Sequence, residues 1–268
     1  MDLIHAIILG VVQGLTEFLP ISSSGHLIVF PHVFGWIQQP LAFDTTLHLG
    51  TAVALVVYFF KDLLKIISGF VRDVWNFEDE FSKFSHDGKL GLYILLGSVP
   101  AGVIGFLFND KIESVFRTVE YVVLFLILGS ALMLFAERLG KWKKNKKVGY
   151  LESLVIGLFQ SLALLPGISR SGSTISGGML FGLNREEAAK FSFLLSIPIV
   201  VLAGGFELKT SLPALQGITW QLMLAGFLSS FAVGLLTIKF LLDFLKEHDL
   251  WVFVVYRFLL AVFLLLYI

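Results

Sequence analysis

The sequence predicts an all-α polytopic membrane protein, and its composition gives two reasons. Apolar residues make up 56% of the 268 residues and charged residues only 15%, whereas soluble domains carry about 25% charge. The mean hydropathy is +0.86. The 20 basic and 20 acidic residues could not cover the surface of a soluble protein of this size, so most of the surface must face lipid.

The charge balance and the absence of cysteine exclude several classes of function. A net charge of zero gives no overall footprint for nucleic acid, so we expect no such partner. A chain without cysteine has no disulfide, no thiolate metal ligand and no cysteine nucleophile. We also expect no secretory signal peptide, because residues 1–20 lack a basic start and carry Gln13, Glu17 and Pro20 within the apolar run.

Six apolar segments approach the roughly 20 residues that a spanning helix needs. They are Leu41–Phe60, Leu90–Phe108, Val119–Ala136, Ala188–Phe206, Gln221–Phe240 and Leu250–Ile268. We therefore expect six transmembrane helices.

Two further apolar segments are interrupted by Pro, Gly and Ser. The first, Leu3–Phe18, stops at Pro20 and then resumes after Gly25, and the second, Leu151–Leu165, stops at Pro166 and resumes as Ile175–Leu183. Each half is too short to cross the bilayer. Irregular backbone at membrane depth persists only where it is buried in protein or lines a wet cavity, so the pattern predicts two re-entrant helix hairpins.

The basic residues predict how these segments are oriented, because cytoplasmic loops carry an excess of Lys and Arg. If the tract 138–149 is cytoplasmic, alternation of the spans places 15 of the 20 Lys and Arg residues on that side and three on the other. Both termini then face outward. The first hairpin enters from outside, and the second enters from the cytoplasm.

The two interrupted segments also indicate an internal repeat. With a shift of 147 residues they share seven identities in sixteen positions without a gap. The identical residues are Gly10, Gln13, Leu15, Ile21, Ser22, Ser24 and Gly25, which match Gly157, Gln160, Leu162, Ile168, Ser169, Ser171 and Gly172. Three spans follow each hairpin, and because three is odd, the second copy must be inverted, as in many transporters.

This repeat predicts the organisation of the chain. The first repeat is 1–138, the basic linker is 139–149, and the second, inverted repeat is 150–268, all within one membrane domain. Discontinuous helices of such repeats meet near the midplane, so we expect the breaks 19–26 and 166–174 to face each other.

The breaks carry the polar residues that suit phosphate chemistry. Gln13 and Glu17 share one helix face, and a carboxylate within a membrane segment is costly and usually functional. In the second break, Arg170 stands among Ser and Gly ahead of a helix, where a guanidinium and backbone N–H groups suit an oxyanion. Together the breaks suit hydrolysis of a phosphate ester or anhydride.

These motifs resemble those of the undecaprenyl-diphosphate phosphatase family, also called the bacitracin-resistance family. The resemblance rests on Gln13-x-x-x-Glu17, on Pro20-x-Ser22-Ser23-Ser24-Gly25-His26 and on Pro166-Gly167-x-Ser169-Arg170-Ser171-Gly172-x-Thr174, and it extends through Phe43-Asp44, Ser176-Gly177-Gly178-Met179 and Tyr256-Arg257-Phe258. The first motif position is Glu or Gln in the family. This chain has Gln13, and so one carboxylate fewer than members with Glu.

The resemblance implies hydrolysis of undecaprenyl diphosphate to undecaprenyl phosphate and inorganic phosphate. This reaction recycles the lipid carrier for peptidoglycan, and it confers resistance to bacitracin, which competes for the diphosphate substrate. The resemblance also implies a divalent cation (Mg or Ca) and a location in the plasma membrane (the cell inner membrane), in contact with membrane lipid, with the active site toward the outer face. The sequence leaves a homodimer possible.

The resemblance also implies roles for individual residues. Glu17 holds the cation or acts as general base, and Arg170 binds the diphosphate. The attacking group is Ser23, His26 or water, and the sequence does not choose among them. The expected substrate-binding residues are Gln13, Ser22, Ser24, Gly25, Ser169, Ser171, Gly172, Ser173 and Thr174, although each hydroxyl of the second break could cap a helix instead.

Other readings remain beside this one. The main rival is an inverted-repeat transporter or flippase of a lipid phosphate or small anion. Arg257 is expected to be structural and to snorkel from its helix. Asp44 and His48 share a helix face at the outer end of the first span; they could shape the site, but we expect them to be hydrated at the surface. Lys141–Lys147 is expected to set topology rather than bind a ligand.

Overall fold

The computed structural model describes residues 2–76, 83–140, 146–211 and 219–267, and all regular structure in these ranges is α-helical. The helices are α1 (Leu3–Thr16), α2 (Ser23–Val33), α3 (Leu41–Tyr58), α4 (Phe60–Trp75), α5 (His86–Phe116), α6 (Val119–Gly140), α7 (Tyr150–Leu162), α8 (Arg170–Leu180), α9 (Arg185–Ser211), α10 (Trp220–Glu247) and α11 (Trp251–Tyr267). Part of the basic linker, 141–145, lies outside the described residues, as does Ile268.

Four of the described helices have the length and apolar composition needed to cross a membrane. They are Leu41–Tyr58, His86–Phe108, Val119–Gly140 and Trp220–Glu247, which correspond to the first, second, third and fifth of the expected spans. The fourth expected span lies within α9, whose first turns carry Arg185, Glu186, Glu187 and Lys190. The sixth is α11, an apolar helix of 17 residues.

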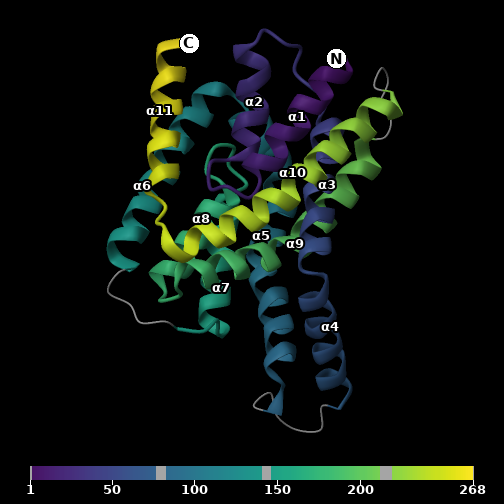
Figure 1. Cartoon of the computed structure of the whole chain (residues 1–268), viewed down its shortest axis with the longest axis vertical. Helices are drawn as coiled ribbons and strands as arrows, with labels where there is room; N and C mark the ends of the chain where they lie inside the picture. Colours follow the sequence, from purple (N-terminus) through teal and green to yellow (C-terminus); the bar gives the residue numbers. More distant parts are fainter. Residues whose placement is uncertain (1, 77–82, 141–145, 212–218, 268) are drawn as a thin grey trace.

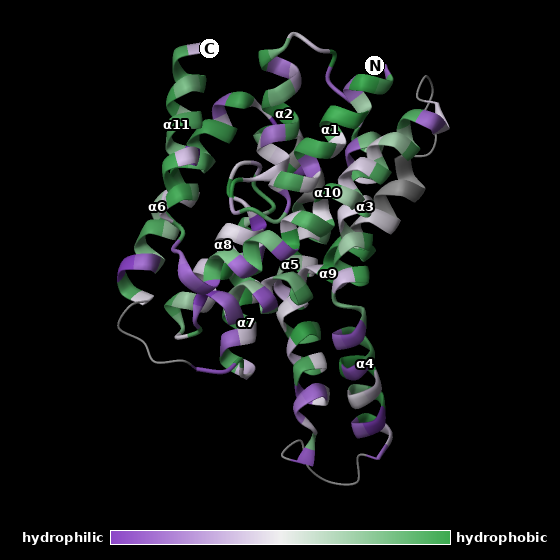
Figure 2. Cartoon of the chain, viewed as in Figure 1, coloured by the Kyte–Doolittle hydropathy of each residue, from purple (hydrophilic) through white to green (hydrophobic). Residues whose placement is uncertain are grey.

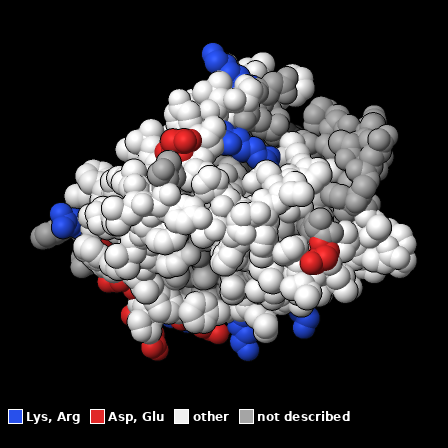
Figure 3. All heavy atoms as spheres, turned by 90° about the horizontal axis from the view of Figure 1, so that it is seen from above, with Lys and Arg blue, Asp and Glu red and all other residues white. Residues whose placement is uncertain are grey.

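The chain ends and the charged segments lie at opposite ends of the molecule. Figure 1 shows both termini at one end, and the α4–α5 arm and the start of α7 at the other. In Figure 2 the hydrophilic residues gather toward the arm and the start of α7, and apolar residues dominate the opposite half. The face on the side of the termini carries only scattered charged atoms (Figure 3). The charged segments are therefore gathered at the end of the molecule opposite the termini.

Helix α4 is not one of the six spans that the sequence predicts. The chain bends at Phe59 and continues as a 16-residue helix, which packs against α5 to form the arm. Gly69 allows this contact, because a Cβ there would lie 3.1 Å from the backbone nitrogen of Gly88. A mixed apolar and charged sequence can form such a helix when a neighbour covers one face.

The two hairpins lie at the centre of the molecule, where their breaks are packed in the main hydrophobic core. Phe18 and Ile21 of the first break and Ile175 of α8 belong to one buried cluster. Phe18 is fully buried and contacts Phe193 of α9 edge to face, with 5.4 Å between ring centroids. The breaks are therefore held in a fixed position by apolar packing, which also excludes bulk water from one side of the polar residues.

Candidate active site

The two breaks end in matching helix starts. Ser22 precedes α2 and Ser169 precedes α8, and each hydroxyl accepts a hydrogen bond from the backbone N–H three residues on, at 3.3 and 3.1 Å. Their φ angles are 77° and 76°, and among the described residues no other non-glycine residue has a positive φ. Such a conformation is costly for a residue with a Cβ and clusters at functional sites. Its occurrence at positions 147 apart indicates that the two turns share one backbone design.

The breaks contact each other directly. The Ser22 hydroxyl accepts a hydrogen bond from the backbone N–H of Gly167 at 3.1 Å, and the Ser171 hydroxyl donates one to the carbonyl of Leu19 at 3.2 Å. Gly167 has φ +111°, and a Cβ there would lie 2.7 Å from the Val122 carbonyl oxygen. Only glycine fits this approach, so the second break can reach both the first break and α6.

Arg257 of α11 lies beneath both breaks and holds them together. Its side chain is fully buried, and it donates hydrogen bonds to the carbonyl of Pro20 at 3.3 Å and to that of Gly167 at 2.8 Å. It also binds the Ser130 hydroxyl at 3.0 Å. The expectation that this residue snorkels is therefore wrong: the breaks leave carbonyls without helical partners, and the guanidinium supplies donors to them.

Glu17 is the centre of the polar site. One carboxylate oxygen, Oε1, accepts a hydrogen bond from Arg170 Nη2 at 2.7 Å. The other, Oε2, accepts from Ser23 Oγ at 2.6 Å and from Gln13 Nε2 at 3.1 Å. His48 Nδ1 lies 3.3 Å from the same oxygen and 2.8 Å from Gln13 Nε2. The structure thus brings the acidic residue of the first break into contact with the guanidinium of the second.

Arg170 has one further nitrogen to offer. Its Nη1 atom is buried and has no hydrogen-bond partner, although a buried donor without a partner is costly. Because the side chain stands at the start of α8, this nitrogen and the helix N-terminus both favour negative charge. The arrangement therefore suits an oxyanion beside Glu17.

The hydroxyls of the second break are mostly engaged within the protein. Ser173 Oγ and Thr174 Oγ1 donate to the Arg170 carbonyl at 3.1 and 2.7 Å, and Thr174 also contacts Ser192 at 2.6 Å. Ser169 caps α8. The four hydroxyl residues of the second break that were expected to contact the substrate are all buried, namely Ser169, Ser171, Ser173 and Thr174. Gly172, the fifth, is buried against Met133.

In the first break, some of the residues expected to contact the substrate are buried and others are accessible. Ser22 is buried as the helix cap, and a Cβ on Gly25 would lie 3.2 Å from the Ser22 hydroxyl oxygen. Ser23 and Ser24 are half-buried, and Ser24 lines a cavity of about 180 Å³. Of the three serines in the run, Ser23 and Ser24 are therefore the accessible ones.

Both ring nitrogens of His26 have partners away from Glu17. Nδ1 lies 2.7 Å from the Ser22 carbonyl oxygen, and Nε2 lies 2.7 Å from the Tyr256 hydroxyl. The ring also stacks on Tyr256 with 5.7 Å between centroids. Because the Ser22 carbonyl only accepts, Nδ1 carries a proton, and the Tyr256 hydroxyl can then donate to Nε2. The histidine is thus fastened to the base of α2 and to α11.

Asp44 and His48 lie at the site, although the sequence led us to expect them in water at the surface. Asp44 is 3% exposed and pairs with Arg117, while its Oδ1 atom is buried without a partner. With His48, Arg117 and Ser24 it lines the 180 Å³ cavity. The missed signal was an acid and a histidine four residues apart in a membrane span, since such residues face the protein interior.

The oxygen atoms around Glu17 could supply some of the ligands that a hard divalent cation needs, but not all of them. In the described part of the chain, no group of three or more His, Cys, Asp or Glu residues is arranged so that it could hold a metal ion by itself. Gln13 Oε1, however, is buried without a partner beside the Glu17 carboxylate and the Ser23 hydroxyl. Mg²⁺ is commonly held by one or two carboxylates together with substrate phosphates, so these oxygens fit a cation that the substrate also binds.

Comparison with known proteins gives a consistent result over nearly the whole chain. Residues 6–263 match the family described as Bacitracin resistance protein BacA. A protein named undecaprenyl-diphosphatase from Rubrobacter xylanophilus is 46% identical over 265 residues, which cover 97% of this chain and 96% of the relative. Proteins of the same name from Chloroherpeton thalassium and Methanosphaera stadtmanae are 43% and 42% identical, covering 99% and 96% of this chain and 96% and 94% of the relatives.

Proposed function

The chain belongs to the bacitracin resistance protein BacA family, and we propose that it hydrolyses undecaprenyl diphosphate to undecaprenyl phosphate and inorganic phosphate. The observation that carries this proposal is the Glu17 carboxylate, which accepts a hydroxyl proton donor, Ser23, on one oxygen and an anion-binding guanidinium, Arg170, on the other. The reaction regenerates the lipid carrier for peptidoglycan synthesis and removes the diphosphate to which bacitracin binds.

Ser23 is the attacking group in this proposal. Its hydroxyl lies 2.6 Å from Glu17 Oε2, within the reach that a general base needs, whereas both nitrogens of His26 are engaged elsewhere. Glu17 takes the Ser23 proton as Oγ attacks the terminal phosphorus. The anhydride bond breaks, and Glu17 gives the proton to the leaving group, undecaprenyl phosphate. Water then releases inorganic phosphate from Ser23, with Glu17 passing the water proton back to Oγ.

Arg170 positions the diphosphate and stabilises the charge that develops on it. Its unpartnered Nη1 offers a hydrogen bond to a phosphate oxygen, while Nη2 stays on Glu17. Charged donors aimed at developing charge supply a large share of the rate in phosphoryl transfer. A divalent cation, Mg or Ca, would be held by the Glu17 carboxylate and Gln13 Oε1 together with substrate oxygens, and it would neutralise phosphate charge.

We also propose that the protein is an inverted repeat with six spans and two re-entrant hairpins. The matching turns at Ser22 and Ser169 support this, and so do the helix contacts. Helix α1 packs on α10 while its counterpart α7 packs on α5, and the equivalent pairs α3–α9 and α6–α11 pack on each other. With both termini on the outer side of the plasma membrane, the cavity lined by Ser24 and Arg117 gives the site its opening to that side.

The experiment that tests the proposed function measures phosphate release from undecaprenyl diphosphate by the purified protein in detergent. A transporter would release none, because detergent offers no sealed compartment and transport breaks no bond. We expect release by the wild-type chain and a loss of at least about a hundredfold in Ser23→Ala, since a positioned nucleophile and its base supply rate factors of this size or more.

Ser98→Ala is the matched control for this test. Its hydroxyl is also half-buried in a membrane helix but donates only to the carbonyl of Ile94, so its turnover should equal that of the wild type. Full turnover by Ser23→Ala would move the attack to water or His26. No phosphate release by the wild-type chain would overturn the proposed function.

A further inference from the structure

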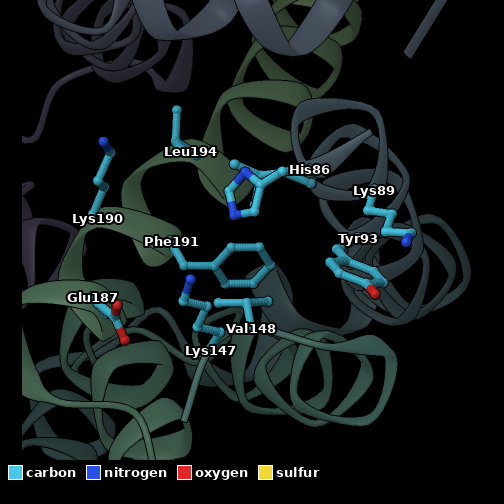
Figure 4. A pocket seen from close by; sticks show the side chains of 10 residues that line it. His86, Lys89, Tyr93, Lys147, Val148, Glu187, Lys190, Phe191 and Leu194 are labelled. Atoms are coloured by element: carbon cyan, nitrogen blue, oxygen red, sulfur yellow. The ribbon is translucent and has the colours of Figure 1, made fainter. Parts of the chain in front are cut away.

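A second cavity lies at the end of the molecule that carries the charged segments, and none of its lining residues belongs to either break. It has a volume of about 390 Å³ and opens between the start of α5, the residues before α7 and the start of α9. Figure 4 shows it from close by. Its lining residues are His86, Lys89, Leu90, Tyr93, Lys147, Val148, Glu187, Lys190, Phe191 and Leu194. None of them takes part in the proposed hydrolysis.

The cavity combines an apolar floor with cationic groups. Phe191 and Leu194 are each 2% exposed, and they form the floor. Lys147 and Lys190 lie at the edge of the cavity. Lys190 is half exposed and forms an ion pair with Asp62, with 3.2 Å between nitrogen and oxygen. Figure 4 shows Lys147 extending beside the Phe191 ring, with His86 above that ring. Cations above an apolar floor suit a ligand with a phosphate at one end and hydrocarbon at the other.

Glu187 adds the opposite charge on the same wall. Its backbone N–H is capped by Asn184 at 2.8 Å, but its carboxylate oxygen Oε2 is buried and has no hydrogen-bond partner. A carboxylate oxygen left without a donor is costly, and a purely anionic ligand would make it more so. A ligand that also carries an ammonium group would satisfy this oxygen.

The position of the cavity fits a lipid rather than a soluble ligand. Leu90 opens the apolar run of α5 directly after Lys89, and Phe191 and Leu194 open that of α9 directly after Lys190. This change from charged to apolar residues on two neighbouring helices marks the level at which lipid headgroups lie. Basic pockets between membrane helices on the cytoplasmic side are known to take phosphate headgroups.

We propose that this cavity binds the headgroup of a zwitterionic aminophospholipid, with the phosphate on Lys147 and Lys190 and the primary ammonium on Glu187. The acyl chains leave over Phe191 and Leu90 toward the bilayer. The site lies on the cytoplasmic side, and a phosphate and an amine in one headgroup satisfy both kinds of charge on its walls. This inference does not depend on the proposed hydrolysis.

Native mass spectrometry of the full-length protein in detergent tests the proposal. The probes are phosphatidylethanolamine, phosphatidylglycerol of the same acyl chains, and soluble glycerophosphoethanolamine. We expect wild-type protein to bind phosphatidylethanolamine about tenfold tighter than phosphatidylglycerol, because one charge-assisted hydrogen bond is worth roughly that factor. The soluble headgroup should bind far more weakly, since it lacks the chains.

Two variants separate the two ends of the headgroup. Glu187→Gln should abolish the preference between the two lipids without reducing phosphatidylglycerol binding. Lys147→Ala should weaken both lipids by a similar factor, and Lys246→Ala, a cytoplasmic lysine paired with Asp243 at 2.8 Å, should change neither. Phosphate release by each variant reports that it is folded. Equal binding of the two lipids by the wild type, or a preference that survives in Glu187→Gln, would overturn the proposal.

Discussion

The two breaks have the same backbone and opposite chemistry. In both, a serine with φ near +77° caps the next helix, yet the residue that follows the cap is Ser23 in the first break and Arg170 in the second. Five residues before the caps stand Glu17 and Leu164. A repeated turn therefore provides two equivalent positions, and different side chains at these positions turn a symmetric contact into an asymmetric reaction site.

The largest loss of phosphate release is expected at Glu17, whose equivalent in the second break is the apolar Leu164. Glu17→Gln keeps the shape of the side chain but removes the negative charge to which Arg170 and Ser23 donate hydrogen bonds. Phosphate release should fall by about 10²–10⁴-fold, the range for loss of a general base, while the protein still purifies as a folded species.

Glu152→Gln is the control for this change. Glu152 is also a buried carboxylate on a hairpin helix, but it pairs with Lys146 at 3.0 Å, away from the breaks. Its phosphate release should stay near that of the wild type. Turnover by Glu17→Gln within threefold of the control's would mean that the first break does not supply the base.

A smaller effect is expected for Arg170→Lys, which keeps the charge in the second break but loses the planar fork. A single ammonium cannot hold Glu17 and also offer the free donor that Nη1 provides. We expect phosphate release to fall by roughly ten- to a hundredfold, somewhat less than the loss of an entire oxyanion donor.

Steady-state kinetics with undecaprenyl diphosphate measures this effect, and Arg72→Lys, on the exposed arm, is its control. Wild-type kinetics in Arg170→Lys would show that only positive charge matters in the second break, and not the fork geometry.

The smallest effect concerns the shared backbone itself. Removal of a serine cap costs about 1 kcal/mol, so Ser169→Ala should lower the apparent melting temperature in detergent by a few degrees. Ser22→Ala should cost more, because the Gly167 N–H that it accepts is then left buried without a partner, at about 1–3 kcal/mol. Equal shifts for the two variants would show that the contact between the breaks adds nothing to stability.

Much of this comparison could be predicted from the sequence. Hydropathy and the proline, glycine and serine interruptions located both breaks, and the shift of 147 residues identified positions that prove to share a backbone conformation. The same repeat predicted that the breaks face each other, and Glu17 and Arg170 are in contact across them. The interruptions are local, and the shift compares the chain with itself, so a single sequence records both.

The remaining features depend on tertiary packing. Hydropathy gives the approximate depth of Arg257 but does not reveal that Pro20 and Gly167 present unpaired carbonyls to it. The helical period places Asp44 and His48 on one face, but which neighbour covers that face depends on how α1 packs against α3. For the same reason, the sequence alone could not separate Ser23 from His26, since the partner of His26 is Tyr256, 230 residues away.

The buried guanidinium of Arg257 has a consequence for how the protein is made. It comes from the last helix, and it donates to the carbonyl of Pro20, near the start of the chain, and to that of Gly167. A nascent chain therefore lacks the guanidinium that holds the two breaks together until its synthesis is nearly finished. We therefore expect hydrolysis of undecaprenyl diphosphate to begin only after the carboxyl-terminal helix has inserted, and chains truncated before Arg257 to be inactive.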